Sequence, residues 1–165
     1  MKAINKKKLI INITIVLAIF FLDRFTKLYI LNIVQANNAA DIYLSSYLNI
    51  YLIWNKGIAF GLLTFDQSIF YNFISLLIAF LTFVILILIV KTRDFRVYFY
   101  LLILGGALGN LFDRVYYSAV PDFIDLHIQN FHWFIFNVAD IFISFGVICL
   151  ILAEMFNKYP NNENK

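Results

Sequence analysis

An aspartate stands at the start of one of the most apolar stretches of this chain. Residues 136–140 read FNVAD, and the sequence continues IFISFGVICLILA. Ionisable groups in segments that are apolar enough for a membrane are rare and usually functional, because a carboxylate there is costly. Asp140 has no basic neighbour in sequence, and the segment VPDFID offers another acid, Asp122, shortly before it. Asp140 is therefore a candidate for chemistry rather than for a local ion pair.

Two carboxylates that are brought together cannot both be ionised cheaply, so one keeps a proton while the other is an anion. The anion can take a proton from water, and the acid can polarise a carbonyl or protonate a leaving amine. Peptide hydrolysis needs those two roles. A pairing of Asp140 with an acid such as Asp122 would supply both at one place.

Other chemistries lack the residues that they require. The serines near polar residues have no histidine at helical spacing, and Cys149 lies deep in an apolar run. Zinc hydrolysis would want HExxH or an equivalent, but His127 and His132 have no glutamate nearby and are expected on a loop surface. There is no GxxxxGK[ST] phosphate-binding loop and no continuous basic patch. We therefore expect no metal, no organic cofactor and no nucleic-acid partner.

The composition places these residues in a membrane protein. Hydrophobic residues make up 62% of the 165 residues, and charged residues make up 14%, well below the roughly 25% of a soluble domain. About 20 apolar residues cross a bilayer as a helix, and four stretches qualify. These predicted spans are residues 9–31, 68–90, 97–115 and 134–156. Together they predict one integral-membrane domain, residues 1–158, followed by a flexible tail, residues 159–165.

A short sheet is expected outside the membrane. Residues 47–54, YLNIYLIW, are rich in residue types that favour strands. They lead into WNKGIAFG, where Asn55 and Gly57 are expected at an outside turn and the glycine can supply a positive φ. Asn55 could present its amide to a peptide backbone. The predicted fold class is therefore an all-α membrane protein with four transmembrane helices and a small extracytoplasmic β-rich subdomain.

Basic residues near the span ends predict the orientation of the chain. Nine of the thirteen lysines and arginines lie before the first predicted span, between the second and third, or after the fourth. These nine are Lys2, Lys6, Lys7, Lys8, Lys91, Arg93, Arg96, Lys158 and Lys165. The other two connections hold one basic residue, Lys56. Both termini are therefore expected in the cytoplasm.

The polar residues within the spans converge at one depth. Asp23 comes fourteen residues after the start of the first span, which is about 21 Å along a helix. Asn110 and Asp113 lie about 20–25 Å into the third span by the same rise per residue. The fourth span runs in the opposite direction, so Asn137 and Asp140 in its first two turns reach the same level. Three helices thus bring carboxylates together near the outer face.

Part of this cluster could serve packing alone. Asp23 and Lys27 are four residues apart and can pair on one helix. Gly105 and Gly109 form a GxxxG pair, which lets helix backbones approach closely. This interpretation stands beside the functional one, since close packing can also surround a site.

Five short motifs follow one another along the chain. They are DRFTK (23–27), NKGIAF (55–60), GGALGNLFDR (105–114), VPDFID (120–125) and FNVAD (136–140). Together they resemble the lipoprotein signal peptidases, the type II signal peptidases of bacteria, over nearly the whole chain. The resemblance implies an intramembrane aspartic endopeptidase that removes the signal peptide from diacylglyceryl-modified prolipoproteins by cutting before the lipidated cysteine. It also implies an enzyme of the bacterial cytoplasmic membrane, surrounded by membrane lipids, with its active site near the outer face and inhibited by globomycin. Separately, nothing in the sequence requires more than a monomer.

The resemblance implies roles for particular residues. The catalytic pair would be Asp122 and Asp140, sharing one proton and activating one water, with Asp125 as a rival that the motif position disfavours. The residues expected to line or support the site are Asp23, Lys27, Asn55, Gly57, Gly105, Gly109, Asn110, Asp113, Arg114, Asn137 and Ala139. The segment HWFIFN (132–137) lacks a proline that relatives often carry, which bears on the local chain path.

Two other classes of protein would also place polar residues in a membrane. A transporter or proton conductor should carry polar groups at several depths, but the second predicted span is uncharged and the inner halves of the others hold essentially no ionisable group. A non-enzymatic assembly factor would use the polar cluster for packing only. Loss of fold rather than loss of turnover in Asp140→Asn would favour that second alternative.

Overall fold

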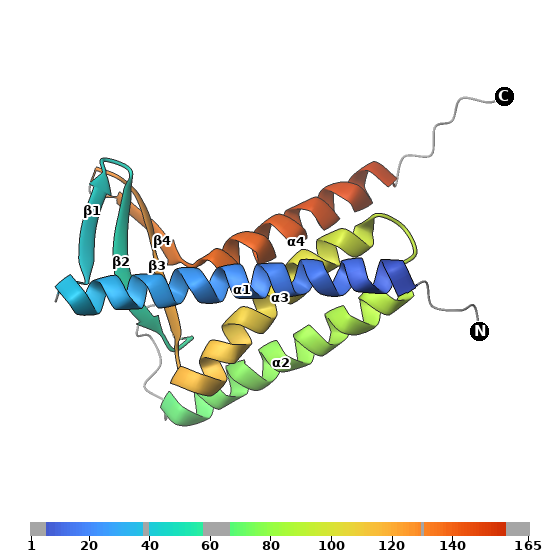
Figure 1. Ribbon diagram of the computed structural model, residues 1–165, viewed down its shortest axis with the longest axis horizontal. Coiled ribbons are helices and arrows are strands. Elements are labelled where there is room, and N and C mark those ends of the chain that lie inside the picture. Colours follow the sequence, from blue (N-terminus) through green and yellow to red (C-terminus); the bar gives the residue numbers. More distant parts are fainter. Residues whose placement is uncertain (1–5, 38–39, 58–66, 130, 158–165) are drawn as a thin grey trace.

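The computed structural model describes residues 6–37, 40–57, 67–129 and 131–157, in which four helices are joined to one small sheet (Figure 1). The helices are α1 (Lys6–Asn37), α2 (Gln67–Lys91), α3 (Arg96–Tyr117) and α4 (Val138–Asn157). The strands are β1 (Asp41–Ser45), β2 (Leu48–Asn55), β3 (Val120–Ile128) and β4 (Phe131–Phe136). Residues 58–60 of the NKGIAF motif and the predicted tail, residues 159–165, lie outside the described residues.

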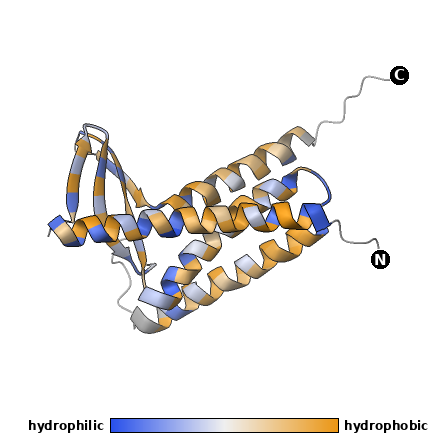
Figure 2. Ribbon diagram, viewed as in Figure 1, coloured by the Kyte–Doolittle hydropathy of each residue, from blue (hydrophilic) through white to orange (hydrophobic). Residues whose placement is uncertain are grey.

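The helices form a bundle in which α3 contacts each of the other three. Three described helical segments are long and apolar enough to cross a membrane: α1, residues Tyr71–Lys91 and residues Val138–Phe156. Figure 2 shows that apolar residues predominate along these helices, and large apolar side chains of α2 such as Phe73 and Leu76 are exposed. In water such exposed apolar surfaces would promote aggregation, whereas in a membrane the lipid chains cover them. The prediction of four helices is confirmed, and three of them are apolar spans.

The central helix α3 differs because much of its surface is covered by the other helices. Nine of its residues are buried, including three glycines, Asp113 and Arg114. An added Cβ at Gly105 would lie 2.8 Å from Ile19 Cβ on α1, and one at Gly106 would lie 2.5 Å from the carbonyl oxygen of Ala139 on α4. The predicted close approach of helix backbones is therefore confirmed at Gly105, which faces α1, and Gly106 provides a second close approach, to α4.

The sheet is larger than the sequence analysis predicts. Its strands pair antiparallel in the order β1-β2-β3-β4, and it lies at one end of the bundle, away from both ends of the described chain (Figure 1). The predicted strand at residues 47–54 corresponds to β2. The start of the fourth predicted span was wrong, because residues 131–136 form β4 and the helix begins at Val138.

Candidate active site

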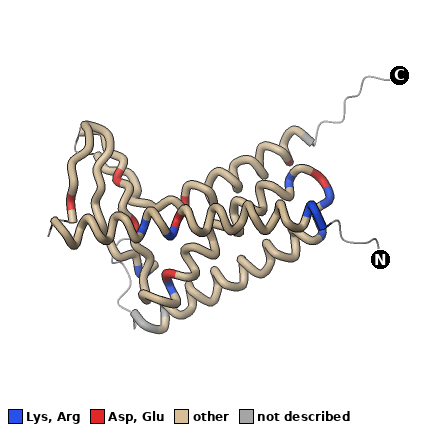
Figure 3. Tube along the Cα trace, in the orientation of Figure 1, with Lys and Arg blue, Asp and Glu red and all other residues tan. Residues whose placement is uncertain are grey.

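Charged residues gather where the helices meet the sheet, and a second group lies at the far end of the bundle (Figure 3). The first group contains Asp122, which is 2% exposed and lies within β3 rather than in a loop. Strand pairing therefore holds Asp122 in place, opposite Ile53 of β2. The sequence analysis did not predict a strand here, and the strand supports this side chain more rigidly than a loop would.

Two asparagines hold the Asp122 carboxylate. Asn55 Nδ2 donates to Oδ2 at 2.8 Å, and Asn137 Nδ2 donates to Oδ1 at 2.6 Å. The pKa of Asp122 is raised to about 6, mainly because burial and the nearby charge of Asp140 outweigh the lowering effect of the hydrogen bond from Asn55. The ionisation of Asp122 therefore lies closer to neutral pH than that of an ordinary aspartate.

Asp140 lies in the first turn of α4 and takes part in a reciprocal helix cap. The Asp140 amide donates to Asn137 Oδ1 at 3.1 Å, and the Asn137 amide donates to Asp140 Oδ2 at 3.1 Å. This is the arrangement of a capping box, in which the first and fourth residues satisfy each other's amides. The spacing N-x-x-D in FNVAD is the signal that the sequence analysis missed.

Asn137 therefore joins the two aspartates. Its side-chain amide donates to Asp122, while its backbone and side chain pair with Asp140. Asn137 is fully buried, as is Ala139 two residues later. The rival carboxylate Asp125 is engaged elsewhere, since it contacts His132 at 2.9 Å.

The second oxygen of Asp140 is held from α3. Asn110 Nδ2 donates to Asp140 Oδ1 at 2.8 Å, and Lys27 Nζ donates to Asn110 Oδ1 at 2.8 Å. Because Lys27 donates to the side-chain oxygen of Asn110, the side-chain nitrogen of Asn110 is the group that faces Asp140. Lys27 on α1 thus acts on Asp140 through Asn110.

Lys27 is 1% exposed, so its charge needs partners. Besides Asn110, its ammonium group donates to Asp23 Oδ2 at 2.8 Å and to Asp113 Oδ2 at 2.7 Å, which uses all three donors of a lysine. Arg24 also pairs with Asp113 and with Asp23. The four groups form a neutral cluster, so pairing between helices is part of the role of Asp23 and Lys27. The sequence analysis did not select Arg24, although it adjoins Asp23 in the DRFTK motif.

Asp23 also connects the cluster to α4. Its Oδ1 accepts a hydrogen bond from the Ala139 amide at 3.0 Å, one of the amides that a helix N-terminus leaves without an intrahelical partner. An added Cβ at Gly109 would lie 2.5 Å from Asp23 Oδ2. Gly109 is therefore required for Asp23 to reach the end of α4.

Asn55 and Gly57 form the predicted turn at the end of β2. The Gly57 amide donates to Asn55 Oδ1 at 2.7 Å, and Gly57 has a φ of 81°. This leaves Asn55 Nδ2 for Asp122, rather than for a peptide backbone as the sequence analysis suggested. Gly57 adopts a backbone conformation that other residues enter with strain.

Arg114 is not joined to either aspartate by a contact among the described residues. Its guanidinium lies 5.7 Å from the ring centroid of Tyr71 on α2, and its Nε and Nη1 atoms are buried without a hydrogen-bond partner in the described part of the chain. An added Cβ at Gly57 would be 3.4 Å from Nη1. Arg114 therefore lies between α2 and the Asn55–Gly57 turn, and Tyr71 is a neighbour that the sequence analysis missed.

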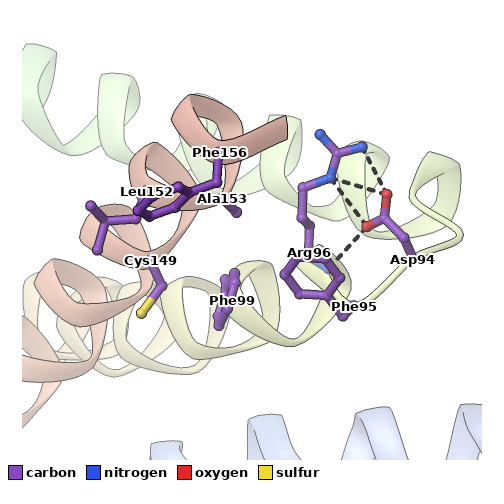
Figure 4. Close-up of a pocket in the computed structure, with 8 residues that line it drawn as sticks. All are labelled: Asp94, Phe95, Arg96, Phe99, Cys149, Leu152, Ala153 and Phe156. Atoms are coloured by element: carbon purple, nitrogen blue, oxygen red, sulfur yellow. Dashed lines mark hydrogen bonds and ion pairs between the residues drawn. The ribbon is translucent and has the colours of Figure 1, made fainter. Parts of the chain in front are cut away.

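A pocket of about 620 Å³ lies at the opposite end of the bundle, between α3 and α4 (Figure 4). Its polar residues are Asp94 and Arg96, which pair at 2.7 Å. A hydrogen bond from the Arg96 side chain lowers the pKa of Asp94 below its usual value. Because both groups are committed to an ion pair and the other lining residues are apolar, this pocket lacks the acid and base that Asp122 and Asp140 offer.

Known proteins resemble this chain in both sequence and structure. Residues 15–156 match the family described as signal peptidase (SPase) II. A lipoprotein signal peptidase of Pelagibacter ubique is 52% identical over 99% of this chain and all of that protein. One of Francisella tularensis subsp. novicida is 41% identical over 82% of this chain and 86% of that protein. A solved structure described as a bacterial membrane enzyme has a TM-score of 0.69 and 28% identity, covering 93% of each chain.

Proposed function

The chain belongs to the signal peptidase II family of aspartic peptidases and removes signal peptides from prolipoproteins, and we propose that Asp122 and Asp140 are the catalytic pair. One observation carries this proposal: Asn137 bonds to both carboxylates, one from the sheet and one from α4. No other described residue makes hydrogen bonds to both.

The proposed reaction uses the pair as one acid and one base. The ionised carboxylate takes a proton from a water molecule, whose oxygen attacks the scissile carbonyl carbon. The protonated carboxyl donates its proton to the carbonyl oxygen, which gives a neutral tetrahedral diol. When the C–N bond breaks, the amine leaves with a proton from one aspartate, and the other accepts a proton from the diol. The pair then again holds one proton.

The surrounding residues act by position. Asn55 and Asn137 fix the Asp122 oxygens, and Asn110 fixes one Asp140 oxygen. These amides hold the carboxylates while leaving the proton to be shared between them. A buried site with fixed donors stabilises developing charge more strongly than water does. Arg114, with buried donor atoms that lack a partner among the described residues, is proposed to bind the substrate backbone.

The membrane arrangement is part of the same proposal. We infer that α3 is a fourth span, that both termini are cytoplasmic, and that the site lies near the outer face. The excess of basic residues beside the termini and the α2–α3 connection supports this orientation. The signal peptide would enter sideways from the lipid, with the acyl chains of a diacylglyceryl cysteine remaining in the bilayer and the cut falling before that cysteine. We propose that the protein acts as a monomer and is inhibited by globomycin, because it has one site that is open to the lipid.

The test uses purified full-length protein in liposomes with a diacylglyceryl-modified precursor. Asp122→Asn and Asp140→Asn should each reduce turnover by at least about a hundredfold, because each removes an acid–base group. Asp41→Asn is the matched control, since Asp41 is an exposed carboxylate at the start of β1 in the same sheet. Near-normal turnover of either site variant, with helical content retained, would rule out the assignment.

A further inference from the structure

A second group of titratable side chains lies on the sheet, outside the peptidase site. Asp125 and His127 are two residues apart on β3 and therefore point to the same face. His132 of β4 pairs directly with His127 across the strands. The sequence analysis expected these histidines on a loop surface, but both lie in strands and His127 is buried.

The three side chains present their donor atoms to one another. His132 Nδ1 lies 2.9 Å from Asp125 Oδ2, and His127 Nδ1 lies 3.7 Å from the same oxygen. One ligand atom from each residue lies within 4.8 Å of the others. In a tetrahedral zinc site with bonds of about 2.1 Å, neighbouring ligand atoms are about 3.4 Å apart. The observed separations of 2.9 Å and 3.7 Å lie on either side of that value.

His127 supplies an independent reason to expect a ligand. The residue is 9% exposed, and its Nδ1 is a buried atom without a hydrogen-bond partner among the described residues. The separation of 3.7 Å from Asp125 is too long for a hydrogen bond. A buried polar atom of this kind is costly unless something satisfies it. It is directed toward the carboxylate of Asp125, which is itself 3% exposed.

We propose that Asp125, His127 and His132 bind a divalent transition-metal ion of the Zn²⁺ class. Two imidazoles and a carboxylate form a donor set that suits Zn²⁺. The His132 side chain is 54% exposed, so the ion can be reached from solvent and a water can complete the coordination.

This site is distinct from the peptidase site. Asp122 and Asp125 are separated by three residues on a continuous strand, so they point to opposite faces of β3. The ion would clamp β3 to β4 beside the turn at Gln129, whose φ is 53°. It would therefore stabilise the hairpin that carries Asp122 on one strand and leads into Asn137 on the other.

The experiment uses full-length, tag-free protein in detergent, treated with a chelator and then titrated with ZnSO₄ by calorimetry. We expect one Zn²⁺ per chain with a Kd tighter than about 10 µM and a higher midpoint of thermal unfolding. Asp125→Asn, His127→Gln and His132→Gln should each weaken binding at least about tenfold. Asp41→Asn, an exposed carboxylate of the same sheet, should leave the Kd unchanged.

A second measurement covers the case in which a variant fails to fold. The chain has two histidines, so the Cu²⁺-loaded wild-type protein should show electron paramagnetic resonance coupling to two imidazole nitrogens. A signal without imidazole nitrogens would overturn the proposal. So would the absence of Zn²⁺ binding to the wild-type protein, or binding that survives in the double variant His127→Gln/His132→Gln. Binding that is lost only in Asp122→Asn would place the ion at the peptidase site and would also contradict the proposal.

Discussion

At the scale of single residues, the two proposed catalytic carboxylates differ in what supports them. Asp122 lies on a strand and is held by two side-chain amides, whereas the Asp140 side chain also accepts a hydrogen bond from the Asn137 amide and so caps the helix that carries it. The motifs VPDFID and FNVAD could identify both residues through their resemblance to the family. They could not show that Asn137 connects them, since residue spacing does not reveal how a strand is placed beside a helix end.

The pKa of Asp122 predicts how stability depends on pH. Because the folded pKa is raised from 3.8 to about 6, this residue favours the folded state below pH 3.8, and that contribution is lost as the pH rises to about 6. The loss amounts to about 3 kcal/mol. The difference in unfolding free energy between the wild-type protein and Asp122→Asn should therefore change by about this amount between pH 3 and pH 7. A difference that is independent of pH would contradict the raised pKa.

The buried lysine predicts a large effect on stability. Lys27→Met should destabilise the protein by about 3–5 kcal/mol, because Asp23 and Asp113 would lose a buried partner. Asn110 would also lose the group that fixes its amide, so cleavage should slow in whatever protein remains folded. Thermal unfolding in detergent measures the first effect, with the exposed Lys91→Met as control. Equal midpoints for the two variants would show that the cluster carries little stability.

At the scale of elements, helices were easier to predict than strands. Long apolar runs fix the spans, and the helical rise places their polar residues, so the shared level of Asp23, Asn110 and Asp140 could be predicted and is confirmed by contacts. The strand β3 contains a proline and two aspartates, which are uncommon in strands. The aromatic strand β4 runs directly into α4 and reads as part of one apolar segment.

Helix packing predicts a sensitive glycine. Gly109→Ala should cost about 1–3 kcal/mol by overpacking, and it should also reduce cleavage, because the new methyl group would displace Asp23 from the start of α4. Gly146→Ala is a matched control: its added Cβ would lie 2.7 Å from Ile103, away from the aspartates. Both variants should unfold at lower temperature, but only Gly109→Ala should lose more activity than its folded fraction explains. Equal specific activities would contradict this role for Asp23.

At the scale of the whole molecule, the bundle separates two polar ends. The sheet and the proposed catalytic aspartates lie at one end, and the α2–α3 connection, which carries Lys91, Arg93 and Arg96, lies at the other (Figure 1). Apolar composition and charge bias were enough to predict this division, because the membrane imposes both. The arrangement of the sheet depends on pairing between distant strands, which a single sequence reveals poorly.

This arrangement predicts which positions are reachable from outside the cell. In a Cys149→Ser background, Asp41→Cys should react with a membrane-impermeant maleimide in intact cells, and Lys6→Cys should react only after permeabilisation. The reason is that basic residues beside spans are retained in the cytoplasm. Labelling is read on gels of the purified protein. Reaction of Lys6→Cys in intact cells would reverse the proposed orientation.

The most direct test of the central claim is whether Asp122 and Asp140 act as one unit. Single-turnover cleavage of a lipidated precursor would be measured for Asp122→Asn, Asp140→Asn and the variant carrying both substitutions. Groups that serve one chemical step are strongly non-additive, so the double variant should be no slower than the slower single variant. Rate losses that multiply in the double variant, with all three proteins folded, would contradict a shared proton and a shared water.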